Sequence, residues 1–308
     1  SLMNIAVTGG TGFIGNAVIT GLLSQNYHVV AAVRSEDSSV PKGAGMIRVG
    51  GLSAETDWSS ALKRIDVVVH TAARAHIMND SAADPLAEFR KVNTAGTLNL
   101  ARQAASAGVK RFIFISSIGV NGNCDTHPFT ESDIVNPQEP YAVSKWEAEQ
   151  GLVELGKGRR EKGDRRTGME VVIIRPPLVC GANAPGNFGR LVKWVKRGVP
   201  LPLGAVHNKR SFVALDNLVS FIIHCMDHPR AANKVFLISD GEDVSTTELL
   251  QKMARAFGKR SLLLPVPVAL MTFAAGLLGK KDVADRLFGS LQVDSSKARD
   301  LLGWTPVV

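Results

Sequence analysis

Eight residues near the N-terminus restrict the fold most strongly. They read Thr-Gly-Gly-Thr-Gly-Phe-Ile-Gly, end at Gly15, and directly follow the apolar run at residues 4–8. Gly9 permits a tight turn, Gly12 lets the backbone approach a diphosphate, and Gly15 lets the following helix pack closely on the strand. The free N–H groups at the start of that helix then face the phosphate charge. The segment predicts a dinucleotide site between the first strand and the first helix.

Apolar runs and helix-like segments alternate through the first half of the chain. The short runs predict strands that are buried on both faces. They are residues 4–8, 28–33, 46–49, 66–71, 111–116 and 170–175, with helices expected at residues 13–24 and 85–106. Strand–helix alternation of this kind predicts right-handed βαβ units. The expected fold class is α/β, with a Rossmann-type doubly wound parallel sheet.

The pattern changes after about residue 178. Glycine and proline become more frequent and short helices dominate, while residues 234–238 read as a further strand of the sheet. We therefore expect residues 3–177 to form mainly the dinucleotide-binding Rossmann domain. Residues 178–308 are expected to form mainly a smaller α/β substrate-binding lobe, with some segments returning to the Rossmann sheet.

The charge and the cysteines restrict the partners. The formal net charge is +8, part of it in residues 157–166, which we expect to form a solvated loop. A nucleic-acid module would interleave aromatic residues with the basic ones. The basic run contains no aromatic residue, so no nucleic-acid partner is expected. A basic surface also suits diphosphate ligands. Three cysteines without metal-ligand spacing predict free thiols, no metal site and a reducing, cytoplasmic location.

One apolar segment, residues 262–279, reaches the lower limit of a membrane-spanning length. Pro265 and Pro267 near its start favour a turn, followed by a buried helix from about Val268. No transmembrane span is therefore expected. Peripheral contact with a membrane surface stays open.

Tyr141 and Lys145 stand four residues apart, which places both on one face of a helix. A free tyrosine has a pKa of about 10 and is a poor base at neutral pH. A nearby ammonium stabilises the phenolate, so Lys145 is expected to lower the pKa of Tyr141. Lys145 can also bind the ribose hydroxyls of a nicotinamide nucleotide.

The glycine turn, with its T-G-x-x-G-x-x-G spacing, and the Tyr-x-x-x-Lys pair together resemble the extended short-chain dehydrogenases of the NAD-dependent epimerase/dehydratase family. The resemblance covers nearly the whole chain. It includes H-x-A-A at residues 70–73, N-x-x-G-T at 93–97, R-P-P-L at 175–178, R-x-F-V at 210–213 and L-G-W-x-P at 302–306. The resemblance implies that Ser117, Tyr141 and Lys145 are catalytic. The hydroxyl of Ser117 would bind the reacting oxygen and position it for Tyr141.

The resemblance also implies the binding residues. Those expected to bind the cofactor are Thr8, Gly9, Gly12, Phe13, Ile14, Gly15, Arg34, Leu52, Thr71, Ala72, Ala73, Asn93, Ser116, Tyr141, Lys145, Pro176 and Leu178. Those expected to bind the substrate are Ser117, Asn187 and Arg210, the last through a diphosphate. Arg34 stands where an NAD-selective site has a carboxylate, which favours NADP(H). Glu36 and Asp37 nearby leave NAD(H) open.

Ile118 and Gly119 exclude one of the reactions that the family carries out. Related 4,6-dehydratases carry an acid and a base at these positions, so dehydration is not expected here. The favoured function is a cytoplasmic 4-ketoreductase that reduces a UDP-4-keto-6-deoxy-N-acetylhexosamine in surface-polysaccharide biosynthesis. A UDP-glucose or UDP-N-acetylglucosamine 4-epimerase with retained NAD, a reductase of flavonoid or steroid type, and a non-catalytic NADP-sensing protein remain alternatives. A homodimer is expected through helices near residues 85–106 and 141–155.

Overall fold

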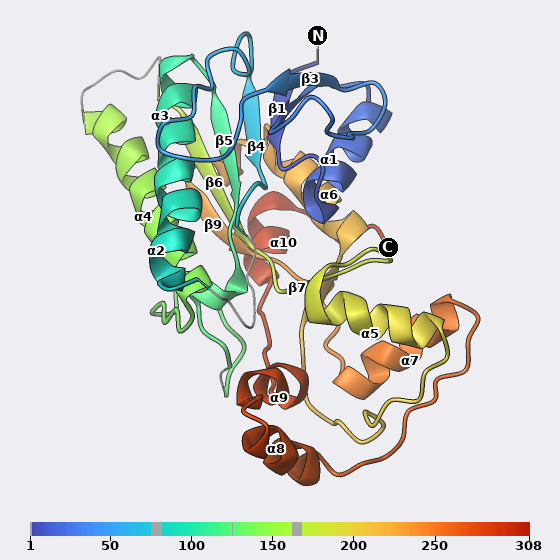
Figure 1. The fold of residues 1–308 in the computed structure, drawn as a ribbon. Coiled ribbons are helices and arrows are strands. Elements are labelled where there is room, and N and C mark those ends of the chain that lie inside the picture. Colours follow the sequence, from blue (N-terminus) through green and yellow to red (C-terminus); the bar gives the residue numbers. More distant parts are fainter. Residues whose placement is uncertain (1, 75–81, 125, 162–167) are drawn as a thin grey trace.

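The computed structural model describes residues 2–74, 82–124, 126–161 and 168–308. Seven parallel strands form its main sheet in the order β3-β2-β1-β4-β5-β6-β9 (Figure 1). They are β1 (Asn4–Thr8), β2 (His28–Val33), β3 (Gly45–Arg48), β4 (Val67–His70), β5 (Arg111–Ile115), β6 (Glu170–Arg175) and β9 (Lys234–Leu237). The order confirms the predicted Rossmann-type sheet. Each predicted strand end lies within one residue of the observed end.

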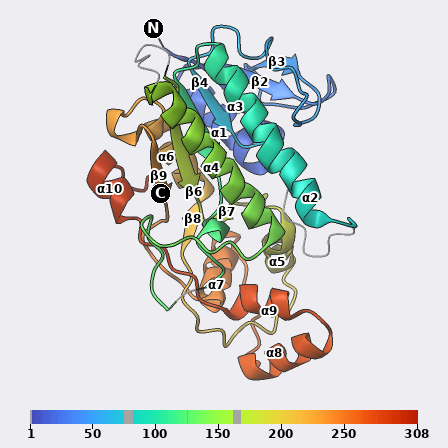
Figure 2. The same ribbon diagram turned by 90° about the vertical axis from the view of Figure 1, so that its left-hand side faces the viewer.

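Helices cover both faces of this sheet (Figures 1 and 2). One face packs against α1 (Phe13–Ser24), α6 (Leu215–Cys225) and α10 (Ser296–Leu302), and the other against α3 (Thr97–Ser106) and α4 (Pro140–Glu161). Successive strand residues point to opposite faces, so Ile5 and Val7 belong to one core and Ala6 to the other. Burial on both faces explains why the strands are almost wholly apolar.

The strand order reverses between β1 and β4. β1 pairs with β2 on one side and with β4 on the other, so Thr8 and His70 end neighbouring strands. In open α/β sheets the ligand crevice lies outside the carboxyl ends of the strands at such a reversal. The glycine turn begins at this point.

One local prediction is wrong. β3 is an edge strand and is not buried on both faces, and its Met46 is 46% exposed. The helix expected at residues 85–106 forms over that range, as α2 (Pro85–Phe89), a π-helical stretch (Arg90–Gly96) and α3 without a gap. The basic segment 157–166 lies partly outside the described residues, and α4 extends into it as far as Glu161.

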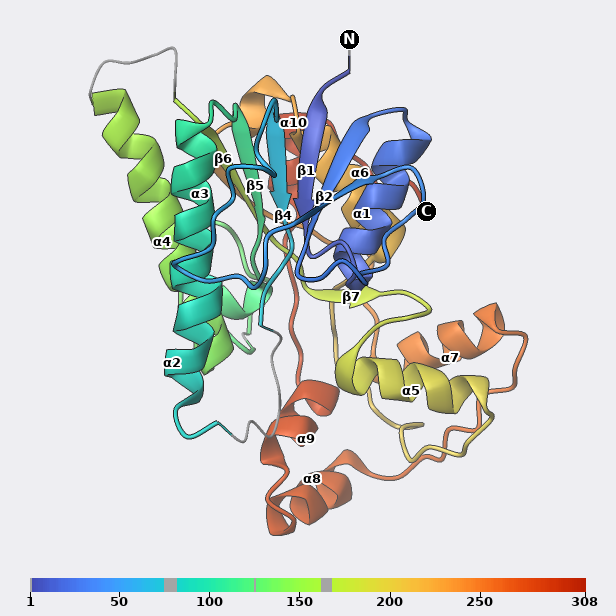
Figure 3. The same ribbon diagram turned by 45° about the horizontal axis from the view of Figure 1, so that its top comes forward.

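Four helices form a second, smaller body below the carboxyl ends of the strands, which we call the lobe (Figures 1 and 3). They are α5 (Gly186–Lys196), α7 (Thr246–Ala256), α8 (Val268–Leu277) and α9 (Lys281–Phe288). A two-stranded parallel sheet, β7 (Leu178–Cys180) and β8 (Phe212–Ala214), joins the lobe to the main body. The lobe has its own apolar cluster, which includes Leu191, Leu201 and Leu250.

The helix expected near Val268 forms, but the prediction that it is buried is wrong. α8 contains no buried residue, and Leu270, Phe273 and Leu277 are 59%, 65% and 74% exposed. Only its inner side, with Val268 and Met271, packs against the lobe cluster. Among the residues that the structure describes, no helix has both the length and the apolar character needed to cross a membrane.

Phe221 provides a test of the packing between the main sheet and the C-terminal segment. Its ring is fully buried and lies edge-on to Phe236 and Trp304, with ring centres 5.6 and 5.2 Å away. We expect Phe221→Ala to lower the free energy of unfolding by about 3–5 kcal/mol in denaturant titrations. The control Phe273→Ala removes an exposed ring and should change it by less than about 0.5 kcal/mol. Equal losses in the two variants would contradict the assignment of Phe221 to the core.

Candidate active site

The glycine turn is packed so closely against the protein that a side chain at either of two of its glycines would collide with neighbouring atoms. Gly9 has φ +69°, and a Cβ there would lie 2.5 Å from the Thr71 hydroxyl oxygen. A Cβ on Gly15 would collide with the carbonyl oxygen of Gly9. α1 begins after Gly12 without a side-chain cap, so its first N–H groups remain available to an anion. These features fit the diphosphate of a nicotinamide dinucleotide.

A buried clasp joins the ends of β1 and β4. The hydroxyl of Thr8 accepts hydrogen bonds from the N–H groups of Thr71 (3.0 Å) and Ala72 (3.1 Å). Its own proton is then directed to His70 Nδ1 at 2.6 Å, so the other ring nitrogen, Nε2, carries the proton and donates to Thr97 at 2.8 Å. The Thr8 hydroxyl predicted to bind the cofactor therefore positions the 71–73 turn.

Tyr141 and Lys145 lie in the first two turns of α4, as their spacing predicts. The Lys145 ammonium donates to the carbonyl of Ile115 at 3.0 Å and lies 5.9 Å from the centre of the Tyr141 ring. It also lies 4.7 Å from the centre of the Phe114 ring. These contacts hold the pair against the carboxyl end of β5.

Burial controls the ionisation of this pair. It raises the pKa of Tyr141 to about 12, so the predicted net lowering of this pKa is wrong. Burial likewise lowers the pKa of Lys145 to about 8, while the carboxylate of Glu149 acts in the opposite direction. Burial, followed by the charge of Lys145, lowers the pKa of His70 to about 3. At neutral pH Tyr141 therefore carries its proton and His70 is neutral.

Ser117 is the second residue after β5 and heads a short 3-10 turn, where its hydroxyl oxygen accepts the N–H of Gly119 at 3.0 Å. A Cβ on Gly119 would lie 3.3 Å from both the Ser117 oxygen and the Ala142 Cβ. This close approach brings the Ser117 turn against the start of α4. The three predicted catalytic residues therefore come from two adjoining segments.

Asn93 lies in the π-helical stretch and is almost fully buried. Its side-chain oxygen accepts the Arg74 N–H (2.8 Å), and its amide donates to the Arg74 carbonyl and to the Ser144 hydroxyl, each at 3.2 Å. Ser144 in turn donates to the Tyr141 carbonyl at 2.6 Å. Asn93 thus joins the loop after β4 to the Tyr141 helix. π-helical turns occur frequently at functional sites.

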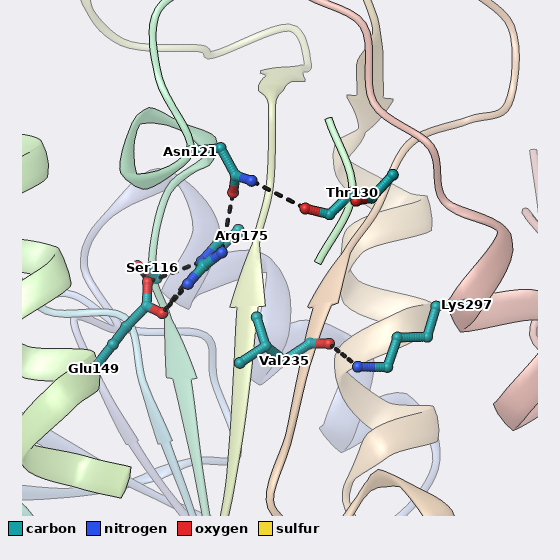
Figure 4. Close-up of polar contacts among 7 residues, drawn as sticks. All are labelled: Ser116, Asn121, Thr130, Glu149, Arg175, Val235 and Lys297. Carbon is teal, nitrogen blue, oxygen red and sulfur yellow. Dashed lines mark hydrogen bonds and ion pairs between the residues drawn. The ribbon is translucent and has the colours of Figure 1, made fainter. Parts of the chain in front are cut away.

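A buried ion pair anchors the same helix from its other side (Figure 4). The Arg175 guanidinium donates to the Glu149 carboxylate at 2.6 Å and to Asn121 at 3.0 Å, and Ser116 donates to Glu149 at 2.6 Å. The side chains of Glu149 and Arg175 are only 1% and 4% exposed. The Ser116 hydroxyl, predicted to bind the cofactor, is therefore used within this network. Glu149 was not predicted from the sequence, although it continues the four-residue spacing that begins at Tyr141.

Several residues predicted to contact the cofactor lie at the carboxyl edge of the main sheet. Arg34 is exposed immediately after β2, and Leu52 packs so tightly against Gly96 that a Cβ there would lie 2.8 Å from the Leu52 side chain. The other members follow β1, β4 or β6, or begin α1; they are Phe13, Ile14, Thr71, Ala72, Ala73, Pro176 and Leu178. All of these segments meet at the carboxyl edge of the sheet. Asn187 is exposed in the first turn of α5.

Two arginines lie close enough together for their charges to repel. Arg210 donates to the Gly289 carbonyl at 2.9 Å, and burial together with the charge of Arg286 lowers its pKa. Arg286, on α9, pairs with Glu139 directly before α4. Two neighbouring guanidiniums suit a diphosphate. Arg286 has no motif around it, and only the packing of α9 brings it to Arg210.

Known proteins share this architecture. The model of the NAD dependent epimerase/dehydratase family matches residues 5–239. The chain is 48% identical to a UDP-glucose 4-epimerase of Vibrio cholerae, over 98% of this chain and 90% of that one. The structure of the UDP-glucose 4-epimerase from Thermotoga maritima with UDP-glucose superposes with a TM-score of 0.74, at 26% identity over 99% and 94% of the two chains. The Bordetella bronchiseptica enzyme WbmG in complex with NAD and UDP gives 0.74 at 24% identity, over 100% and 91%.

The buried ion pair predicts that loss of the Glu149 carboxylate destabilises the protein far more than loss of the Glu147 carboxylate on the same helix. Glu149→Gln leaves Arg175 without its counter-charge and should lower the free energy of unfolding by about 3–5 kcal/mol. The control Glu147→Gln removes an exposed partner of Arg90 and should cost less than about 1 kcal/mol.

The same variant should change the pH profile. Glu149 raises the pKa of Lys145, so its loss moves the deprotonation of Lys145 to lower pH. If charged Lys145 supports turnover, the alkaline fall in kcat should move to lower pH in Glu149→Gln and stay in place in Glu147→Gln. Equal destabilisation of the two variants and an unmoved alkaline limb would contradict this role for Glu149.

Proposed function

Since the chain belongs to the NAD-dependent epimerase/dehydratase family, we propose that this nucleotide-sugar enzyme carries out its redox step at C4 of the sugar. The observation that carries the proposal is the protonated Tyr141 beside Lys145, next to the Ser117 turn and at the same edge of the sheet as the glycine turn. We propose the direction of a 4-ketoreductase, which converts the C4 ketone of a UDP-4-keto-6-deoxy-N-acetylhexosamine into an alcohol for surface-polysaccharide biosynthesis.

In this reaction each predicted catalytic residue acts on the C4 oxygen. The hydroxyl of Ser117 donates a hydrogen bond to the ketone oxygen, and Tyr141 transfers its proton to that oxygen. When bound, the nicotinamide cofactor supplies the hydride to C4. Lys145 stabilises the phenolate that Tyr141 leaves behind, and a proton from water restores the phenol. Hydride and proton together account for the two hydrogens added.

The surroundings of Ser117 support redox chemistry without dehydration. Ile118 is buried, and Gly119 packs between Ser117 and Ala142. Neither residue can transfer a proton, so elimination of water would lack its acid and base. This supports redox chemistry at C4 alone, without elimination of water from neighbouring carbons.

Arg34 supports the reductase direction. A carboxylate at the end of the second strand would bind both ribose hydroxyls of NAD, whereas Arg34 is exposed there and can pair with a 2′-phosphate. We therefore propose NADP(H) as the cofactor, exchanged at each turnover.

The second candidate is a UDP-sugar 4-epimerase. It is supported by the name of the V. cholerae relative, at 48% identity, and by the T. maritima structure with UDP-glucose. In an epimerase Tyr141 would have to lose its proton first, because only its phenolate could accept the C4 hydroxyl proton and later return it. A retained NAD would supply the hydride chemistry. The same three residues serve both candidates.

Arg210 and Arg286 support a diphosphate-linked sugar. Their mutual repulsion, which contributes to the lowered pKa of Arg210, would be relieved by two phosphate charges between them. We propose that UDP is the carrier and that Asn187 contributes to the same substrate site. We also propose that a homodimer forms through the outer surfaces of the helices at residues 85–106 and of α4.

Tyr141→Phe tests whether this chain is an enzyme of this type. The change removes the transferable proton and should lower kcat by about 10²–10⁴-fold, the usual contribution of general acid catalysis. Binding of NADPH, followed by fluorescence titration, should stay within about twofold because the ring remains. A kcat of Tyr141→Phe equal to that of the wild type would contradict the role of Tyr141.

The cofactor separates the two candidates. The reductase should be purified without bound nucleotide, consume NADPH in step with the keto sugar, and lose preference for NADPH over NADH by about 10–100-fold in Arg34→Asp, as expected for charge-assisted contacts. Tightly bound NAD that survives dialysis, with interconversion of UDP-sugars without added reductant, would refute the reductase and support the epimerase.

A further inference from the structure

The outer side of α8 is apolar where a surface helix is normally polar. Leu270, Phe273 and Leu277 follow the spacing of one helix face and are the side chains that α8 exposes most among its large apolar ones. The following Leu278 is 74% exposed. No charged residue lies within α8. A contiguous apolar face of this kind marks an interaction surface.

Basic residues surround this helix. The segment 257–281, which contains α8, holds Lys259, Arg260, Lys280 and Lys281, all exposed, and no Asp or Glu. α9 then adds Asp282 and Asp285, so the acidic residues begin only after Lys281. The apolar face is therefore bordered by cations at both ends.

A second segment of the lobe continues the same charge. Residues 186–210 contain six Lys and Arg and no Asp or Glu. Backbone hydrogen bonds of Leu201 with Leu262 (2.9 Å) and with Leu264 (2.7 Å) join the two segments. Together the segments hold ten cations and no acid, whereas the rest of the chain has 26 basic and 28 acidic residues. The whole positive excess of the chain is thus gathered in the lobe.

We propose that α8 and the four exposed cations that flank it dock on an anionic lipid surface, with α8 lying in the plane of the membrane interface. An apolar helix face with flanking Lys and Arg is the combination that binds the boundary between head groups and acyl chains. At ten residues α8 is about 15 Å long, too short to span a bilayer. A second copy of the chain fits less well, because pairing this face with itself would oppose two basic surfaces.

The position of α8 is compatible with docking during turnover. α8 lies at the far end of the lobe from the main sheet (Figures 1 and 3). α8 packs against α9, whose Arg286 repels the charge of Arg210. The docked surface is thus one helix away from the predicted diphosphate site. The proposal does not depend on which sugar reaction the enzyme performs.

Vesicle flotation of the full chain tests the proposal. The protein should float with vesicles made of equal parts phosphatidylglycerol and phosphatidylcholine, and far less with phosphatidylcholine alone, and raised salt should weaken the binding. Phe273→Glu should lower the partition coefficient by about tenfold or more. The matched control Met46→Glu changes a 46% exposed residue of β3 at the opposite end of the molecule and should stay within about twofold of wild type.

A charge variant tests the contribution of the flanking cations to lipid binding without altering the apolar face of α8. Lys280→Ala with Lys281→Ala should weaken binding by about fivefold for each cation removed. Unchanged turnover and circular dichroism of the variants confirm that they fold. Absence of binding to the anionic vesicles, equal binding to neutral ones, or a dimer in lipid-free solution that Phe273→Glu dissociates would overturn the proposal.

Discussion

The candidate site depends on a buried ion pair between α4 and β6. Glu149 and Arg175 are withdrawn from water, which is tolerated only because hydrogen bonds from Ser116 and to Asn121 complete their coordination. The pair fixes the face of α4 that carries Tyr141 and Lys145 against strands that end at the same edge of the sheet as the glycine turn. It also sets a negative charge one helical turn beyond Lys145, which limits how far burial lowers the pKa of that ammonium.

A second buried network, which carries no charge, joins other elements of the site. Thr8, His70 and Thr97 hold β1, β4 and α3 together through hydrogen bonds whose directions leave His70 uncharged. A second positive charge beside Lys145 would repel it. A neutral histidine avoids this repulsion, so Lys145 remains the cation nearest the Tyr141 ring among the contacts that the structure describes.

The sequence predicts the features that local spacing encodes. The sheet, the glycine turn and the Tyr141–Lys145 pair follow from periodicity and from residue types that the chemistry needs at fixed intervals. Features that depend on distant packing were missed. Arg286 is placed by α9, the exposure of α8 depends on the small size of the lobe, and the pKa of Tyr141 depends on how completely its phenol is desolvated. The hydrogen bonds of the Ser116 and Thr8 hydroxyls to Glu149 and His70 also depend on residues distant in the sequence, which a family motif does not reveal.

Isotope transfer tests the central claim, that hydride moves at C4 while Tyr141 moves only a proton. The reaction would be run with the 4-keto sugar and NADPH deuterated at the transferable position of the nicotinamide, and separately in D₂O with unlabelled NADPH. The account predicts that the C4 hydrogen of the product comes from the nicotinamide and none of it from solvent. Deuterium at C4 from D₂O, or product without label from deuterated NADPH, would contradict it.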